Sequence, residues 1–347
     1  MISRFLGILI LAATPYAGQA QQTAKDTIHL YFLGGQSNME GYGYTKDLPD
    51  SLDTTFENVF IFEGNPTDDE QPVGGQGVWE PLQPGHGTGF KSDGKTNTHS
   101  NRFGIELSFA KKLQEYYPGQ KIALIKYAKG GSSIDSLAAA QFGAWDPHYN
   151  GKTGINQYDH FLATLNNALN TKDLDGDGRE DYLVPMGILW MQGESDGDKT
   201  EAIAEEYYHN LSQLMNLIRA SLRTDDLPVV VGKISDSWNA PDGKVWDYGE
   251  LVQYAQEKFA REDSNAVIIR STRYYKYSDP WHYDSAGYID FGKQLAEKYD
   301  LPTEPKPVQI GVRFEAPQKH FQKLIDISYD FKLYRKFDDV SLRSFCT

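Results

Sequence analysis

Cysteine is nearly absent from this chain of 347 residues, in which Cys346 is the only one. A single thiol cannot form an intramolecular disulfide bond, and it cannot supply the paired thiolates of a cysteine-based metal site. Basic residues are also scarce, with 34 Lys and Arg against 48 Asp and Glu and a formal charge of −14. This charge disfavours nucleic acid and anionic lipid as partners, and it suits a neutral or weakly charged ligand.

Long apolar runs are missing after the N-terminal segment, so we expect no membrane-spanning helix there. Residues 1–20 have the pattern of a secretory signal peptide, because Arg4 precedes a short apolar core and small residues end at Ala20. A buried first helix is the alternative interpretation of this segment. We therefore expect a periplasmic or secreted protein whose signal peptide is cleaved.

Apolar, β-branched runs alternate with amphipathic segments through residues 26–300. The expected strands lie at 27–32, 121–127, 184–190, 227–231 and 266–269. Apolar residues at helical spacing lie in the segments 103–116, 158–169, 202–222, 251–259 and 285–299. This alternation predicts one α/β domain with about five mainly parallel strands and helices on both faces. Residues 301–347 form a tail of mixed composition, and the sequence leaves its role open.

A serine stands at the tip of a glycine turn directly after the first expected strand, in Gly34-Gly35-Gln36-Ser37-Asn38. The carboxyl end of a parallel strand is where α/β proteins place their chemistry. A glycine-rich phosphate cradle is the alternative, but no lysine follows and no glycine pattern runs into a helix. We expect Ser37 to be reactive, and we expect Gln36 and Asn38 to shape its turn through hydrogen bonds.

A candidate base for this serine lies near the end of the domain, in Asp279-Pro280-Trp281-His282. A neutral imidazole can accept the serine proton on one ring nitrogen while a carboxylate fixes the other nitrogen as N–H. We assign His282 as the base and Asp279 as its partner. Asp284 is the competing partner, although Asp284 or Ser285 can instead cap the helix that follows.

Two further turns supply candidate donors for an oxyanion. Gln192 follows the expected strand 184–190, where its side-chain amide can point an N–H into the site. Gly131 is the favoured backbone donor of the second turn, with Gly130 close behind, because a glycine lets its N–H approach a substrate oxygen. Glu194 either holds loops together as a hydrogen-bond acceptor or serves as a second acid or base.

Residues 63–101 show no regular period and are rich in Gly, Pro, Asn and Asp. A loop of this length in a compact domain is usually functional. It contains Trp79, His86, Phe90 and His99, which we expect to form part of the wall of the site.

Asp173, Asp175, Asp177 and Asp181 place acidic oxygens at alternate positions, as in the first nine positions of an EF-hand loop. Val184 stands where the twelfth-position Glu belongs, so this is not a helix–loop–helix sensor. One interpretation is a structural Ca²⁺ loop that clusters the four aspartates. The other is a solvated acidic turn before a strand.

Four motifs in this order resemble the SGNH hydrolase superfamily. More narrowly, they resemble its sialate O-acetylesterase-like branch, which includes carbohydrate esterase family six and its acetylxylan esterases. The motifs are Gly35-Gln36-Ser37-Asn38-Met39, Lys129-Gly130-Gly131-Ser132-Ser133, Trp190-Met191-Gln192-Gly193-Glu194-Ser195-Asp196 and Asp279-Pro280-Trp281-His282. Residues 102–110 also match, and the resemblance spans about residues 27–300.

The resemblance implies a flavodoxin-like three-layer α/β/α sandwich. It also implies Ser37 as the nucleophile, His282 as the base and Asp279 as the partner of that base. The implied oxyanion donors are the Ser37 N–H, a glycine N–H at 130–131, and the side chain of Gln192.

The expected function is that of a secreted serine esterase that removes O-acetyl groups from a carbohydrate through an acetyl-enzyme intermediate, with no cofactor required. The expected partner is an acetylated oligo- or polysaccharide, with xylan, pectin-type polymers and acetylated sialic acid all open. Which of these glycans is the substrate would depend on the loops 63–101 and 132–157. A non-catalytic sugar-binding protein and a lipase or thioesterase are the competing classes, and the intact Ser, His and Asp argue against the first.

Overall fold

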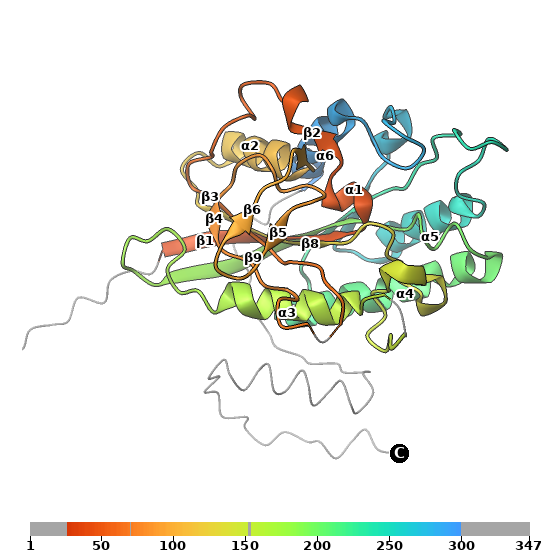
Figure 1. The fold of residues 1–347 in the computed structure, drawn as a ribbon, viewed down its shortest axis with the longest axis horizontal. Helices are drawn as coiled ribbons and strands as arrows, with labels where there is room; N and C mark the ends of the chain where they lie inside the picture. Colours follow the sequence, from red (N-terminus) through yellow and green to blue (C-terminus); the bar gives the residue numbers. More distant parts are fainter. Residues whose placement is uncertain (1–25, 70, 152–153, 300–347) are drawn as a thin grey trace, which may run out of the picture.

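The computed structural model describes residues 26–69, 71–151 and 154–299. The expected signal peptide at 1–20 and the tail at 301–347 lie outside these described residues. The centre of the described domain is a seven-stranded sheet with helices on both faces (Figure 1). No helix in the described ranges is both long and apolar enough to cross a membrane.

Six strands of the sheet are parallel, and they lie in the order β11-β10-β9-β1-β8-β3, with β4 antiparallel to β3 at the edge. Their bounds are β1 Asp26–Gly35, β3 Val59–Glu63, β4 Glu80–Pro81, β8 Ile122–Ala128, β9 Asp181–Met191, β10 Val229–Gly232 and β11 Ala266–Ile269. The five strands expected from the sequence are β1, β8, β9, β10 and β11. They follow the 2-1-3-4-5 order of flavodoxin-like folds.

The parallel strand that the sequence analysis missed is β3, which extends the sheet beyond β8, and the short edge strand β4 was not expected either. All five of its residues are buried. A short apolar run of this kind has no alternating pattern, because both faces of a covered parallel sheet are dry. The expected number of parallel strands was therefore one too low.

The helices form the two outer layers. Their bounds are α1 Ser37–Glu40, α2 Glu106–Tyr116, α3 Gln157–Leu169, α4 Glu201–Ser221, α5 Gly249–Glu262 and α6 Ser285–Lys298. Helices α2 and α6 pack together on one face, whereas α3 and α4 lie on the other and α5 packs against α4 (Figure 1). The expected three-layer α/β/α sandwich is confirmed.

Two small antiparallel ribbons and four 3₁₀ turns decorate the connections. The ribbons pair β2 Gly43–Tyr44 with β7 Arg102–Phe103, and β5 Lys91–Ser92 with β6 Asn97–Thr98. The 3₁₀ turns are Thr45–Asp47, Ser136–Ala138, Ala140–Phe142 and Ser271–Tyr274. Of these pieces, the ribbon of β5 and β6 lies in the segment 63–101, which the sequence leaves without a regular period.

The central strand β1 positions the site. Its last residue, Gly35, is paired with Ala128 of β8 on one side and with Met191 of β9 on the other. After β1 the chain forms β3 and β4 at one edge of the sheet, then β8 beside β1, and it next passes to β9 on the other side of β1, so the strand order reverses at β1. Such a switch point opens a crevice at the carboxyl ends of the strands. The turns that follow β1, β8 and β9 therefore meet at one place.

Candidate active site

The turn that carries Ser37, which we call the nucleophile turn after the role expected of that serine, depends on the close approach of β1 and β9. Gly35 has a φ of +147°, and a Cβ there would lie 1.9 Å from the carbonyl oxygen of Met191. Only glycine fits this position. The N–H of Gln36 donates to the same Met191 oxygen at 2.9 Å. Ser37 follows as the first residue of α1.

The Gln36 side chain fastens this turn to the turn after β9. Its Oε1 accepts hydrogen bonds from Gln192 Nε2 at 3.1 Å, Gly193 N at 3.2 Å and Ser195 N at 3.3 Å. Three donors on one amide oxygen leave the nucleophile turn little freedom to shift relative to β9.

Asp279 and His282 form a hydrogen-bonded pair on one loop before α6. His282 Nδ1 lies 2.8 Å from Asp279 Oδ2, and Asp279 Oδ1 accepts the backbone N–H groups of Trp281 and His282, each at 2.8 Å. Burial alone would raise the pKa of Asp279, but these hydrogen bonds outweigh it and lower that pKa. Asp284 instead caps α6, since it accepts the Gly287 N–H at 2.8 Å. Asp279 is thus the carboxylate on His282.

Asn38, directly after Ser37, connects the nucleophile turn to this loop. Its Nδ2 donates to the carbonyl oxygen of Trp281 at 3.1 Å, and its Oδ1 accepts the N–H of Tyr283 at 3.3 Å. The two partners flank His282 in the chain, so the Asn38 amide holds the backbone on both sides of the imidazole. No hydrogen bond joins Ser37 Oγ to His282 among the described residues. In substrate-free enzymes, such catalytic hydrogen bonds are often long and tighten on binding.

Glu194 lies behind Asn38 and is fully buried. Its Oε1 accepts a hydrogen bond from Asn38 Nδ2 at 2.9 Å, whereas its Oε2 has no hydrogen-bond partner among the described residues. Burial raises the pKa of Glu194 to about 7, although the Asn38 hydrogen bond opposes the shift. Tyr288 completes the set by donating its hydroxyl to Asn38 Oδ1 at 2.7 Å.

Tyr42 stacks on His282 and was missed by the sequence analysis. The two ring centroids are 3.6 Å apart and the ring planes differ by 5°. An aromatic residue between Gly41 and Gly43, five positions after the serine, is the only local signal for it. The stack fixes the plane of the imidazole, and the face of a tyrosine ring stabilises a cation placed over it.

The glycine turn after β8 lies against Ser37. A Cβ on Gly130 would lie 3.4 Å from Ser37 Cβ and 3.0 Å from Glu40 Oε2. The N–H of Gly130 donates to Glu40 at 2.6 Å, so it is already engaged. The hydrogen bonds among the described residues use neither the N–H of Gly131 nor that of Ser37. These two groups are the backbone donors that remain for an oxyanion.

Gln192 is fully buried between three turns. Its Nε2 donates to Asp196 Oδ2 at 2.6 Å and lies 3.1 Å from Gln36 Oε1 and 3.2 Å from Ser132 O. Its Oε1 accepts the Tyr207 hydroxyl at 2.9 Å. Both amide hydrogens therefore point to protein acceptors. The role of Gln192 as an oxyanion donor stays a prediction, and in this arrangement its side chain holds the turns together.

Asp196 extends the same bracing to the loop after the glycine turn. Its two oxygens accept the N–H of Ile134 at 3.0 Å and the N–H of Asp135 at 2.9 Å. The sequence analysis assigned it no role. An acidic residue two positions after Glu194 carries no signal that separates a loop brace from a solvated side chain.

The four residues expected to form part of the wall of the site divide into two groups by their contacts, and their place in that wall stays a prediction. Trp79 packs on Phe62 with ring centroids 5.6 Å apart, and its Nε1 donates to the carbonyl oxygen of Ala168 in α3. His86 contacts both Phe90 and His99 through its ring. The described contacts thus attach Trp79 to α3 and gather the other three into a separate cluster.

The acidic loop brings three of its four aspartates together. Carboxylate oxygens of Asp173, Asp175 and Asp177 lie within 4.8 Å of one another. Asp181 is not part of this group, because it begins β9 and has turned to accept the backbone N–H of Leu174 at 2.6 Å. A Ca²⁺ ion held by the first three residues stays a prediction.

The family relationship follows from a sequence profile that matches residues 27–300. The profile describes a carbohydrate esterase, sialic acid-specific acetylesterase. The chain belongs to this family. The members of this carbohydrate esterase family are carboxylic ester hydrolases that act on acetylated carbohydrates.

Solved structures show the same fold as this esterase. A protein of Arabidopsis thaliana aligns over 78% of this chain and 97% of its own, with 20% identity and a TM-score of 0.53. NanS aligns over 79% of this chain and 98% of its own, with 17% identity and a TM-score of 0.50. No curated protein matches the esterase in sequence. At these identities the structures support the fold alone.

Proposed function

We propose that this carbohydrate esterase removes O-acetyl groups with Ser37 as nucleophile, His282 as general base and Asp279 as its partner. The observation that carries the proposal is the Asn38 amide. It connects the turn of the serine to the backbone on both sides of the histidine. A distance of 2.8 Å between Asp279 Oδ2 and His282 Nδ1 leaves Nε2 as the nitrogen that accepts the serine proton.

The reaction then has two halves. Ser37 Oγ bonds to the acetyl carbon while His282 Nε2 takes its proton, and the N–H groups of Ser37 and Gly131 stabilise the oxyanion. The C–O bond to the sugar breaks, and the His282 imidazolium returns the proton to the departing sugar hydroxyl. Water, activated by the same imidazole, releases acetate from Ser37. Gln192 joins the oxyanion donors only after releasing one of its present acceptors.

Two exposed tryptophans support an extended sugar substrate. Trp281 precedes His282 and is 50% exposed, and Trp238 is 63% exposed with a φ of +57°. Ser237 Oγ donates to the Pro280 carbonyl oxygen at 2.7 Å, which brings the segments of both tryptophans together. A large exposed ring on a strained backbone points to function, because folding alone gains nothing from it. We propose that these flat rings stack on an acetylated oligo- or polysaccharide.

We also propose that residues 1–20 are a signal peptide. Its cleavage would leave the enzyme in the periplasm or outside the cell. N-terminal sequencing of the protein recovered from the expression host's periplasm or medium tests this. A mature chain that begins near residue 21 supports it, and an intact Met1 in the cell extract contradicts it.

Acetate release from a panel of acetylated glycans tests the reaction. The panel contains acetylated xylan, an acetylated pectin and O-acetylated sialic acid, and each is incubated with the unmodified enzyme and with Ser37→Ala. Ser212→Ala in α4 is the matched control, since it also removes one hydroxyl. We expect Ser37→Ala alone to abolish release. Retention of most activity by Ser37→Ala would refute the mechanism. A parallel series of aryl esters with increasing acyl length tests the competing class, because a lipase would cleave the longer chains faster than the acetate.

A further inference from the structure

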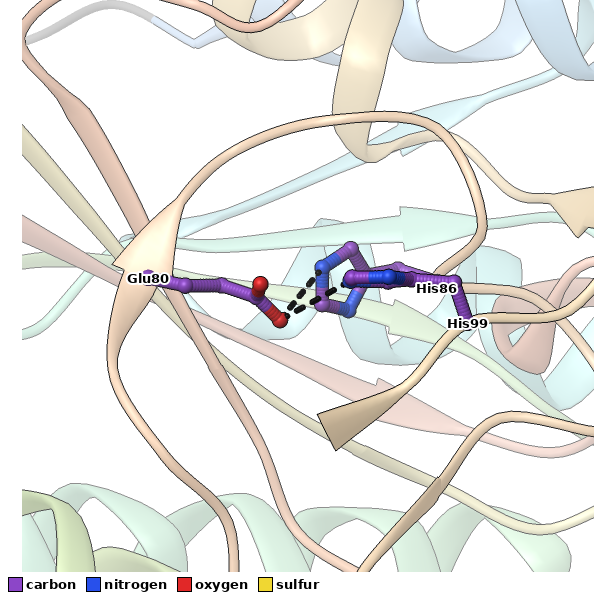
Figure 2. A group of neighbouring side chains, drawn as sticks. All are labelled: Glu80, His86 and His99. Atoms are coloured by element: carbon purple, nitrogen blue, oxygen red, sulfur yellow. Dashed lines mark hydrogen bonds and ion pairs between the residues drawn. The ribbon is translucent and has the colours of Figure 1, made fainter. Parts of the chain in front are cut away.

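Glu80, His86 and His99 come together in the long segment between β3 and β7 (Figure 2). Glu80 belongs to β4, His86 lies in the following loop, and His99 comes just after β6. One oxygen, Glu80 Oε1, lies 3.4 Å from His86 Nε2 and 3.0 Å from His99 Nε2. Three side chains from separate pieces of the segment thus converge on one point.

The spacing of these atoms matches the edges of a tetrahedral metal site. Nitrogen and oxygen ligands lie about 2.1 Å from Zn²⁺, so two of them at the tetrahedral angle are about 3.4 Å apart. The observed separations of 3.4 and 3.0 Å are close to this value. All three atoms lie within 4.8 Å of one another, so a single ion can contact all of them after small side-chain adjustments.

His86 supplies an independent observation. Its side chain is fully buried, and its Nε2 has no hydrogen-bond partner among the described residues. Buried polar atoms are nearly always paired, so an orphaned ring nitrogen aimed at two other ligands requires an explanation. His86 Nδ1 lies 2.9 Å from Glu63 Oε2. A carboxylate behind the second ring nitrogen is the usual support of a metal-bound histidine, because it directs the lone pair of the first toward the ion.

The remaining contacts orient the carboxylate and leave a way in. Asn97 Nδ2 donates to Glu80 Oε1 at 2.5 Å, which holds the carboxylate toward the histidines. The His99 side chain is 32% exposed, whereas His86 is enclosed. An ion can therefore enter from the side of His99, and water can fill the coordination position there.

We propose that Glu80, His86 and His99 bind a divalent transition ion of the Zn²⁺ class. Two imidazoles and a carboxylate suit such an ion better than Ca²⁺ or Mg²⁺, which prefer oxygen ligands. The ion would fasten β4, the loop and β6 to one another at the edge of the sheet. Lys126 connects this cluster to α1, because its Nζ donates to the carbonyl oxygens of His86 and Glu40. The proposal does not depend on the esterase mechanism.

Zinc binding to tag-free protein, stripped with a chelator and titrated with ZnCl₂ by calorimetry, tests the site. We expect one equivalent of Zn²⁺ per chain and a rise in melting temperature of several degrees, since a ligand that binds only the folded state stabilises it. Co²⁺ in the same site should show the visible absorption of a four- or five-coordinate ion. His99→Ala should weaken Zn²⁺ binding by at least about 100-fold, because loss of an outer-shell partner alone costs up to that factor.

Matched variants make the test decisive. His209→Ala removes an exposed histidine of α4 and should bind Zn²⁺ like the unmodified chain. Asp173→Asn tests the acidic loop as the competing site and should also bind normally. Circular dichroism shows whether His99→Ala is folded, and Glu80→Gln takes its place if it is not. Equal affinity of the unmodified chain and either cluster variant, loss of binding in Asp173→Asn, or no Zn²⁺ bound by the unmodified chain would each overturn the proposal.

Discussion

Glu194→Gln changes how the stability of the protein depends on pH. The side chain of Glu194 is fully buried, and within the described part of the chain its only hydrogen bond to another side chain comes from Asn38 at 2.9 Å. Glutamine keeps an oxygen that can accept this bond, but it cannot ionise. The substitution therefore separates the cost of burying a charge from the contact that holds Asn38.

The magnitude follows from the raised pKa of Glu194, about 7 against an ordinary value of 4.5. Because the folded state holds the proton more tightly, this group's contribution to stability is complete at low pH. It is lost as the pH rises through about 7. At 1.36 kcal/mol per pKa unit the full loss is about 3 kcal/mol, of which about 2.5 kcal/mol falls between about pH 5 and 8.5.

Urea unfolding at several pH values measures the effect. The free energy of unfolding of Glu194→Gln, minus that of the unmodified protein, should rise by about 2.5 kcal/mol from about pH 5 to 8.5. The new NH₂ group replaces an oxygen without a partner, which costs about 1–3 kcal/mol at every pH and does not alter the slope. Glu205→Gln, on the exposed face of α4, is the control and should leave the difference flat.

A difference that stays constant across this pH range would refute the reasoning, since burial of the charge would then not govern the pKa of Glu194. Activity distinguishes its two expected roles. If Glu194 only holds Asn38, Glu194→Gln should keep most of its kcat on an aryl acetate. If Glu194 transfers a proton, kcat should fall by about 10²–10⁴-fold.

Three other outcomes follow from the site. Tyr42→Ala should lower kcat on an aryl acetate by about 10-fold, because the stacked ring stabilises the imidazolium by about 1–2 kcal/mol. Tyr42→Phe keeps the ring and should keep most activity, so equal losses in the two variants would contradict this. Trp281→Ala should raise KM for an acetylated polymer while leaving KM for the aryl acetate unchanged, and a parallel rise in both would show that the ring does not bind sugar. Millimolar Ca²⁺ should raise the melting temperature of the unmodified chain and not that of Asp173→Asn, and no shift in either would exclude a structural Ca²⁺ loop.

Local chemistry was readable from the sequence. Asp279 and His282 are three residues apart, so one turn of chain brings them to 2.8 Å whatever the rest of the fold does. The strands β1, β8, β9, β10 and β11 were also readable, because each is a buried apolar run followed by a turn. Parallel strands end at one edge of a sheet, and that rule alone brings their turns together.

Contacts between distant segments were decided only by the tertiary structure. Asn38 and Tyr283 are 245 residues apart, and no spacing rule links an amide after β1 to a backbone N–H before α6. Gln192 shows that the sequence can predict the place of a side chain without predicting its hydrogen-bond partners. Its place directly after β9 was predicted, but two of the three acceptors around its amide, Gln36 Oε1 and Ser132 O, come from other turns.

The sequence by itself determined the fold class, the order of its turns and the residue types that can react, because these follow from local pattern and from the geometry of parallel sheets. The tertiary structure decided which polar groups are already paired and which are left over. Among the residues that the structure describes, it engages the amide of Gln192, leaves the N–H of Gly131 unused, and buries the ring of His86 with one nitrogen unpaired. Pairing depends on distances of a few tenths of an ångström between segments far apart in the chain, and only the folded structure sets those distances.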